Sequence, residues 1–146
     1  MKIGNEIKQQ RFNNVQQKAG MNIIFTANWL SGQYAAALKP IDLSLQQLNV
    51  LAILKGQPKH TASVNLIRDR MIDRMPNVSR LLNKLIEKSL VKKDRQTADQ
   101  RVVHIQLTEL GIKTAEQGRK LFESVTYSLT TKQAKELNDL LDCMHK

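Results

Sequence analysis

A change in the spacing of apolar residues between positions 78 and 107 restricts the fold of this chain more than any other feature. Over residues 78–86 the apolar side chains recur every three or four positions, as in a helix with one buried face. Over residues 102–107 alternate side chains point to opposite sides, as in a strand with one buried face. The helical stripe consists of Val78, Leu81, Leu82, Leu85 and Ile86, and the stripe of the strand consists of Val103, Ile105 and Leu107. The sequence therefore predicts a helix that leads into a β-hairpin with strands at 90–94 and 101–107.

The tip of the predicted hairpin, residues 94–101, carries no apolar side chain apart from one alanine. Asp99 and Arg101 lie two positions apart in this tip. Because the loop has nothing to bury in a core, we expect it to be exposed, and its charges raise the question of what it contacts.

Prolines and helix caps divide the preceding part of the chain. A long helix is expected over residues 23–38, and Gly20 is the candidate break between it and an earlier apolar piece. Ser44 and Gln47 have the spacing of a capping box, and Gly56 is a suitable terminator for the helix that they begin.

The middle and the end of the chain contain four further predicted helices. A brief extended segment at 62–64 leads to a short helix with Asn65 as its candidate cap, and Pro76 suits the first turn of the helix after it. Thr108 begins a helix over residues 109–122, and Thr130 or Thr131 caps the last one. The predicted order is helix, helix, short strand, helix, helix, hairpin, helix, helix.

The charge of the chain favours a polyanionic partner. Lys and Arg number 23 against 13 Asp and Glu, which gives a net charge of +10, so nucleic acid or an anionic membrane is the leading partner class. Residues 68–101 hold 10 basic and 5 acidic groups, whereas residues 102–146 hold 6 of each. The basic surplus therefore coincides with the two short helices and the hairpin.

Two short helices joined by a turn, the second with a polar outer face and followed by a basic hairpin, are typical of a winged helix-turn-helix, in which the hairpin is the wing. The segments SVNLIRDRMIDRMPNVSRLLNKLIEKSLV and DQRVVHIQLTELG resemble the DNA-binding core of the MarR family of bacterial transcriptional regulators. The family's Asp-x-Arg at the wing, its Leu-Thr at the end of the strand and its early helical glycine correspond to Asp99, Arg101, Leu107, Thr108 and Gly111.

The resemblance implies a fold that is mainly α with a small β-hairpin wing (α+β). It implies one MarR-type domain over 1–146, in which residues 41–108 form the winged-helix DNA-binding lobe and residues 1–40 and 109–146 form dimerisation helices. Two positions depart from the family: Ile72 and Ser89 stand where glycine is frequent, in the turn and before the wing. Pro76 replaces the usual Ser or Thr and offers no hydroxyl to a phosphate. These departures put the approach angle of the recognition helix in doubt more than the fold.

The resemblance also assigns roles to the charged and amide side chains. The wing would reach the minor groove, where a narrow groove attracts the guanidinium of Arg101, and Asp99 would brace an arginine by a charge-assisted hydrogen bond. On the recognition helix, Asn pairs best with adenine and Arg with guanine, whereas Ser and Lys more often touch phosphates. The candidate DNA-binding residues are Arg74, Asn77, Ser79, Arg80, Asn83, Lys84, Arg95, Asp99 and Arg101. The alternative is that the helix shows an ordinary solvated face and the hairpin is a turn with incidental charges.

The apolar faces of the first and last helices have no other lobe in the chain to cover them, so a homodimer on a pseudopalindromic operator is expected. A small-molecule effector of unknown identity is also expected to release or modulate the DNA-bound protein. Trp29, Tyr34, Phe122 and Tyr127 are candidates for lining its cleft, although core or dimer packing is the preferred explanation for each of them.

Other function classes find little support in the sequence. The three histidines are scattered, and no catalytic motif, metal-ligand spacing or cofactor loop is present, so we expect no enzyme activity, no metal and no cofactor. Cys143 is the single cysteine and is expected to be a bystander thiol. The sequence has no run of about 18 apolar residues and no apolar signal sequence. We therefore expect a cytoplasmic protein that does not bind a membrane. A sequence-specific regulator, whether a repressor or an activator, is preferred over a nonspecific nucleic-acid-binding or architectural winged-helix protein.

Overall fold

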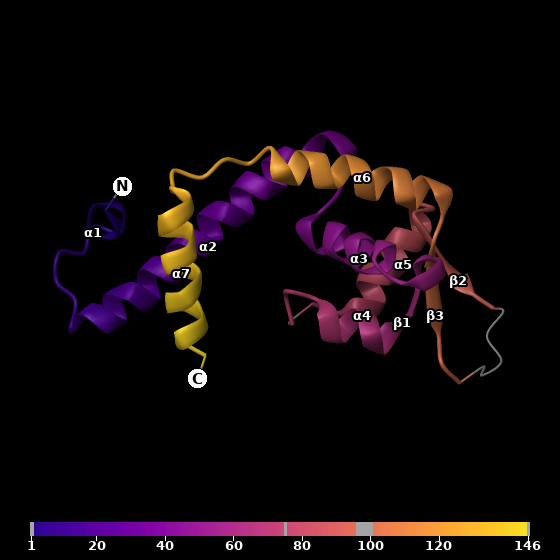
Figure 1. The fold of residues 1–146 in the computed structure, drawn as a ribbon, viewed down its shortest axis with the longest axis horizontal. Coiled ribbons are helices and arrows are strands. Elements are labelled where there is room, and N and C mark those ends of the chain that lie inside the picture. Colours follow the sequence, from indigo (N-terminus) through magenta and orange to yellow (C-terminus); the bar gives the residue numbers. More distant parts are fainter. Residues whose placement is uncertain (1, 75, 96–100, 146) are drawn as a thin grey trace.

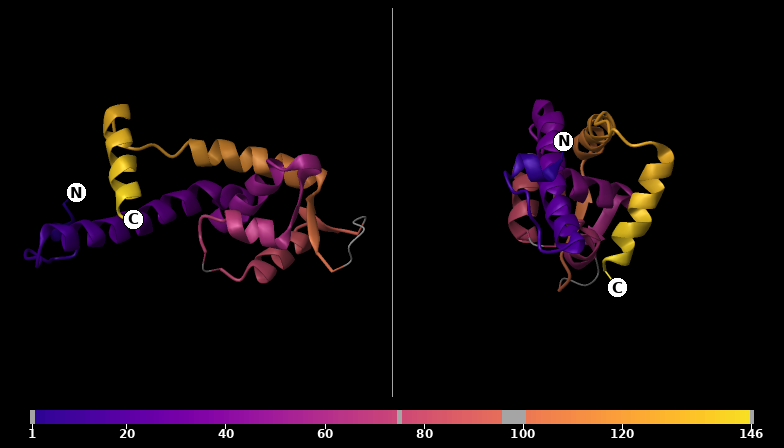
Figure 2. Two further views of the ribbon diagram at one scale, coloured as in Figure 1. Left: turned by 60° about the horizontal axis from the view of Figure 1, so that its bottom comes forward. Right: turned by 90° about the vertical axis from the view of Figure 1, so that its left-hand side faces the viewer.

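Helices α2 (Val15–Leu38) and α6 (Glu109–Glu123) run side by side at one edge of a lobe of shorter elements (Figure 1). The computed structural model describes residues 2–74, 76–95 and 101–145. The lobe holds α3 (Leu45–Lys55), α4 (Val64–Arg70) and α5 (Val78–Glu87), with short 3-10 turns at Lys39–Ile41 and Pro58–His60. The first half of α2 projects away from the lobe, with α1 (Ile3–Glu6) beyond its far end, and α7 (Thr131–Cys143) also stands outside the lobe (Figure 2).

Three short strands form an antiparallel sheet in the order β1-β3-β2. They are β1 (Thr61–Ser63), β2 (Val91–Asp94) and β3 (His104–Leu107). Ile105 of β3 pairs with Ala62 on one side and with Lys93 on the other. The predicted hairpin is therefore confirmed, and the short extended segment before α4 proves to be the third strand of the same sheet.

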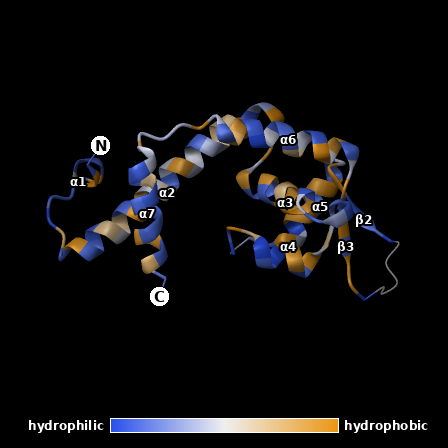
Figure 3. Cartoon of the chain, viewed as in Figure 1, coloured by the Kyte–Doolittle hydropathy of each residue, from blue (hydrophilic) through white to orange (hydrophobic). Residues whose placement is uncertain are grey.

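The core of the lobe combines the predicted helical and strand stripes. Val78, Leu82 and Leu85 of α5 are at most 5% exposed, and Ile105 and Leu107 of β3 are buried beside them. Val103 departs from the prediction, because it is 48% exposed. Strand β3 begins only at His104, although the carbonyl of Val103 accepts a hydrogen bond from the backbone N–H of Val64, which extends the β1–β3 register by one pair. Figure 3 shows the hydrophobic positions of α3, α4 and α5 gathered inside this lobe.

Side-chain caps fix the helix ends much as the sequence predicts. The capping box of Ser44 and Gln47 begins α3, Thr108 caps α6, and Thr130 caps α7 through a second capping box. The expected break at Gly20 is wrong, because α2 runs unbroken through it and begins at the cap residue Asn14. One glycine destabilises a helix by only about 1 kcal/mol relative to alanine, and a helix of 24 residues remains stable despite this cost.

Two other predicted helix starts are wrong by one or two residues. Ser63 rather than Asn65 caps α4, since its hydroxyl accepts the backbone N–H of Leu66 at 3.1 Å while Asn65 lies within the first turn. Pro76 lies outside α5, because Asn77 takes the cap position and accepts the N–H of Arg80 at 3.0 Å. In both places an extended residue with a short polar side chain ends the preceding segment and starts the helix.

Within the described residues, no helix combines the length and the apolar character that crossing a bilayer requires.

Candidate nucleic-acid interface

The apolar face of helix α5 packs against the lobe, and its polar face is exposed to solvent. Ser79, Arg80, Asn83 and Lys84 are all exposed, on the side opposite the buried stripe. These are the expected recognition-helix residues. Asn77, also expected to contact DNA, is exposed as well, but its side-chain oxygen is occupied by the helix cap. Its amide therefore keeps only its N–H donors for a partner.

The structure brings part of the candidate set together in a hollow of about 380 Å³ between α4, α5 and the wing. Ser79 and Asn83 line it from α5, and Arg101 lines it from the start of the returning wing segment. The full lining consists of Ser63, Val64, Asn65, Ser79, Leu82, Asn83, Ile86, Lys93, Arg101, Val102, Val103 and Ile105. The recognition helix and the wing arginine thus open onto one surface.

Three polar residues of this hollow were not among the expected contacts, namely Ser63, whose hydroxyl caps α4, and Asn65 and Lys93. Lys93 lies on the exposed part of β2, and Asn65 is in the first turn of α4, where its side chain accepts a bond from Arg68 at 2.9 Å. The position of Lys93 in a basic strand beside the wing was the available signal. The face of the sheet on which Lys93 lies depends on its pairing with Ile105, and this pairing cannot be read from the sequence.

Five further candidates are exposed but do not line the hollow: Arg74, Asn77, Arg80, Lys84 and Arg95. Arg74 is exposed between α4 and α5, and Arg95 is exposed after β2. Asp99 lies outside the described residues, and so does its expected bond with a neighbouring arginine.

Contacts at both ends hold α5 in place. Asn49 of α3 accepts the backbone N–H of Ile72 at 2.9 Å, which attaches the turn between α4 and α5 to α3. At the other end, Lys88 forms an ion pair with Asp42 at 3.3 Å and donates to Gln47 at 3.4 Å. The orientation of the polar face of α5 is therefore set by α3 and by the segment before it.

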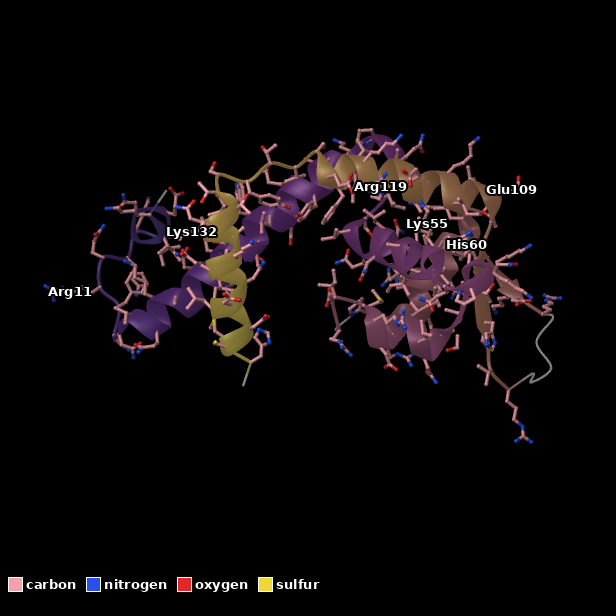
Figure 4. The ribbon with its side chains drawn as sticks, viewed as in Figure 1. Arg11, Lys55, His60, Glu109, Arg119 and Lys132 are labelled. Atoms are coloured by element: carbon pink, nitrogen blue, oxygen red, sulfur yellow. The ribbon has the colours of Figure 1, made fainter. Side chains whose placement is uncertain are left out.

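A second and larger pocket, of about 640 Å³, lies between α3, α6 and the turn before α5. It is lined by Ser31, Leu45, Gln46, Leu48, Asn49, Ala52, Lys55, Gly56, Ile72, Asp73, Ala115, Arg119 and Phe122. Figure 4 shows Lys55 of α3 and Arg119 of α6 at neighbouring positions where the two helices meet.

Of the four aromatic residues expected near an effector, only Phe122 lines this pocket. Tyr34 packs on the other side of Phe122, with the rings stacked at 4.3 Å and 6°. Its hydroxyl is bonded to that of Tyr127, and burial together with this bond raises the pKa of Tyr34 to about 12. Trp29 is 43% exposed on α2. The aromatic residues other than Phe122 therefore pack along α2 and the α6–α7 connection.

Comparison with known proteins places this geometry in a family. The model of the family described as transcriptional regulator SarA/Rot matches residues 33–125, which include the whole lobe and all of α6. The chain belongs to this family. The members of this family are described as transcriptional regulators, and the mainly α fold with its small antiparallel sheet agrees with the predicted class and with the winged-helix fold of solved MarR structures.

Individual relatives of this SarA/Rot chain are distant in sequence. The HTH-type transcriptional repressor IacR of Pseudomonas putida is 28% identical over 109 residues, which cover 72% of this chain and 64% of the repressor. A mutant of MarR from E. coli, complexed with operator DNA, superimposes with a TM-score of 0.77 at 21% identity over 92% of this chain and 99% of its own. BpsR of Bordetella bronchiseptica, whose DNA binding is regulated by 6-hydroxynicotinic acid, gives a TM-score of 0.72 at 19% identity over 88% and 99%.

Proposed function

We propose that this SarA/Rot protein binds a pseudopalindromic DNA operator as a homodimer and represses transcription. The observation that carries the proposal is the shared hollow, where Ser79 and Asn83 of α5 meet Arg101 of the wing. A helix face of amides, hydroxyls and cations beside a basic hairpin provides both a major-groove and a minor-groove element. The fold similarity to MarR with operator DNA and the relationship to a repressor support this assignment.

Each candidate side chain has a proposed role in that complex. Helix α5 enters the major groove, where Arg80 and Asn83 read bases and Ser79 and Lys84 bind phosphates. Asn77 caps the helix and donates its amide N–H groups. Arg101 enters the minor groove and Asp99 braces a neighbouring arginine, as expected from the sequence, while Arg74 and Arg95 bind phosphates of the backbone.

Dimerisation is proposed for residues 1–40 and 109–146, which enclose the DNA-binding lobe of residues 41–108. Large apolar side chains remain exposed on the projecting helices. They include Ile24 at 66% and Trp29 at 43% on α2, and Leu140 at 66% on α7. Of the described residues Thr131–Cys143, none is buried, so α7 has an unused apolar face.

We also propose that the 640 Å³ pocket binds the small-molecule effector. Its volume lies in the range of small-molecule sites, about 300–1,000 Å³. Ile72 and Asp73 in its wall belong to the turn that precedes α5, so a bound molecule would touch the segment that positions the recognition helix.

Selection of genomic DNA fragments by the purified protein, followed by footprinting, tests the DNA-binding part. We expect one protected pseudopalindrome whose half-sites lie about one helical turn, 10 to 10.5 base pairs, apart. Diffuse coverage of all fragments would identify an architectural protein instead. Absence of any binding at low salt would reject DNA as the partner, since a chain of charge +10 should then retain affinity.

A further inference from the structure

The lining of the 640 Å³ pocket is mostly apolar. Leu45, Leu48 and Ala52 contribute from α3, Ala115 and Phe122 contribute from α6, and Ile72 closes the side of the turn. The side chain of Ile72 is 87% exposed, so it is not part of the core and is accessible to a bound small molecule. The body of any molecule that binds here is therefore expected to be apolar.

The two cations in the pocket wall are already neutralised by carboxylates. Lys55 donates to Glu116 at 2.5 Å, and Arg119 donates to the other oxygen of Glu116 at 2.6 Å. Arg119 also donates to Glu123 at 2.7 and 2.8 Å. These bonds to Arg119 and Lys55 lower the pKa of Glu116 to about 2, so its carboxylate stays ionised at neutral pH.

The formal charges of this group therefore cancel, because two cations face two carboxylates. Asp73, a fifth charged residue in the wall or beside it, adds a negative charge rather than a positive one. An anion that entered would lose its hydration without gaining an unneutralised cation, unless it broke the bonds among Lys55, Glu116 and Arg119.

Uncharged hydrogen-bonding groups are nonetheless present. The amides of Gln46 and Asn49 line the pocket, and the oxygen of Asn49 holds the backbone of Ile72 while its N–H groups remain as donors. Ser31 donates to the carbonyl of Ala27 at 2.9 Å, which leaves its oxygen as an acceptor. The polar contacts on offer suit a hydroxyl, amide or ether rather than a carboxylate.

We propose that the pocket selects an uncharged, largely apolar small molecule with a hydrogen-bonding group and discriminates against its anionic analogue. This selectivity rests on the proposed effector function of the pocket and names the chemical class of the effector. The bound molecule would contact α3, α6 and the turn before α5 at the same time. Its binding would therefore change the position of the recognition helix α5.

Two fluorescent compounds that differ by one sulfonate provide the test on the full chain: neutral N-phenyl-1-naphthylamine and anionic 8-anilinonaphthalene-1-sulfonate. We expect the neutral compound to bind more tightly by about tenfold or more, since burying an unpaired charge costs more than 1.4 kcal/mol. The net charge of +10 acts in the opposite direction, so overall electrostatics cannot produce this result.

Three variants assign the signal to the pocket and to its charges. Ala52→Trp, at an exposed position of the lining, should weaken both compounds at least about fivefold by filling the site, whereas Gln117→Trp on the exposed side of α6 should weaken neither. Glu116→Gln leaves the cations with one carboxylate fewer and should tighten the anion while leaving the neutral compound nearly unchanged.

Equal or tighter binding of the sulfonate to the wild type, with loss in Ala52→Trp, would overturn the proposed selectivity. Fluorescence that is the same in the wild type and in Ala52→Trp would overturn the pocket as the site. Mobility shifts with the selected operator, run without either compound, report the DNA-binding function separately, so its failure is distinguishable from failure of the selectivity.

Discussion

Gly111 lies where the first turn of α6 crosses the end of the segment after α5. A Cβ at this position would lie 2.0 Å from the backbone oxygen of Leu90. That oxygen also accepts the backbone N–H of Thr108 at 3.1 Å, so it cannot move without breaking the start of α6. The family resemblance marked this glycine, but only the contact with Leu90 gives the reason for it.

Gly111→Ala should therefore be among the most destabilising single-methyl changes in the chain. We expect the free energy of unfolding to fall by about 3 kcal/mol, at the upper end of the range for overpacking, because the obstacle is backbone. Urea denaturation measures the effect. Gly56→Ala is the matched control, since its Cβ would meet only ordinary contacts at 3.6 and 3.7 Å. A stable Gly111→Ala protein would show that the crossing is looser than described.

Ser89 holds the left-handed conformation that normally favours glycine. Its φ is +60°, and it follows the last residues of α5. The N–H of Leu90 donates to Leu85, and that of Ser89 donates to Ile86, which is the hydrogen-bond pattern of a Schellman motif. The departure from the family at this position therefore leaves the geometry in place at a cost in strain.

Ser89→Gly should relieve that strain. We expect a gain of about 0.5 to 1 kcal/mol in unfolding free energy, because glycine accepts positive φ without a Cβ clash but adds entropy to the unfolded chain. Thermal denaturation is a sufficient measurement. A loss of stability would mean that the Ser89 side chain makes a contact of its own that outweighs the strain.

At the scale of elements, ion pairs join α3 to α6 beside the pocket. The pKa of the Glu116 carboxyl falls from 4.5 to about 2 because Arg119 and Lys55 donate hydrogen bonds to the ionised form. The folded state thus favours the carboxylate. The resulting stability is fully present above pH 4.5 and is lost as the pH falls through about 2.

Glu116→Gln should lower the free energy of unfolding at pH 7, and the difference from wild type should shrink as the pH falls below 4.5. Denaturation series between pH 7 and pH 2 follow this change. Glu136→Gln serves as control, because its pair with Lys132 spans 3.9 Å between exposed side chains and adds little. A difference that does not depend on pH would contradict the role of the Glu116 charge.

The recognition helix and the wing should respond differently to loss of an arginine. Arg80→Ala should weaken binding whatever the operator flanks, by about 1 to 3 kcal/mol at one position if it contacts a base. Arg101→Ala should weaken binding most on A·T-rich flanks with a narrow minor groove. Asp99→Ala should resemble a milder Arg101→Ala. If either arginine contacts phosphate, the slope of log affinity against log salt falls by about 1 in that variant.

Titrations of these variants against operators with A·T-rich and with G·C-rich flanks provide the measurement. Lys113→Ala, an exposed cation on α6, is the control for loss of charge alone. Wild-type affinity of Arg101→Ala on both operators would reduce the wing to a hairpin with incidental charges.

The elements were predictable where local chemistry decides them. The capping boxes at Ser44 and Thr130, the cap at Thr108 and the hairpin strands all follow from neighbouring residues. Pairings between distant segments were not predictable in the same way. The pairing of Ala62 with Ile105 and the bond of Glu116 with Lys55 join positions more than 30 apart, and the place of Lys93 in the hollow depends on strand register, which a periodic pattern does not specify.

At the scale of the whole molecule, the exposed apolar side chains of α2 and α7 determine the proposed dimer. Leu140 is 66% exposed in the single chain, so its replacement removes no internal contact of the lobe. Leu140→Asp should therefore give a folded monomer at micromolar concentration. Asn138→Asp on the same helix introduces the same charge change at an exposed polar position and should remain dimeric.

Light scattering gives the mass of each variant, and circular dichroism shows that the helices persist. A wild-type protein that is monomeric and well folded at micromolar concentration would reject the dimer. If the Leu140→Asp protein still forms dimers, the dimer interface does not include this face of α7.

Helix α2 is a single rod with one end inside the lobe and the other far outside it. Leu38, at the lobe end, is fully buried, while the first half projects beyond α6 (Figure 2). Its 24 residues span about 36 Å at 1.5 Å each. A tilt of about 5° at the distant end would swing a lobe by about 3 Å, close to the 3.4 Å rise of one base pair. In the proposed dimer, a rotation of this size would therefore be enough to move one lobe out of register with its half-site.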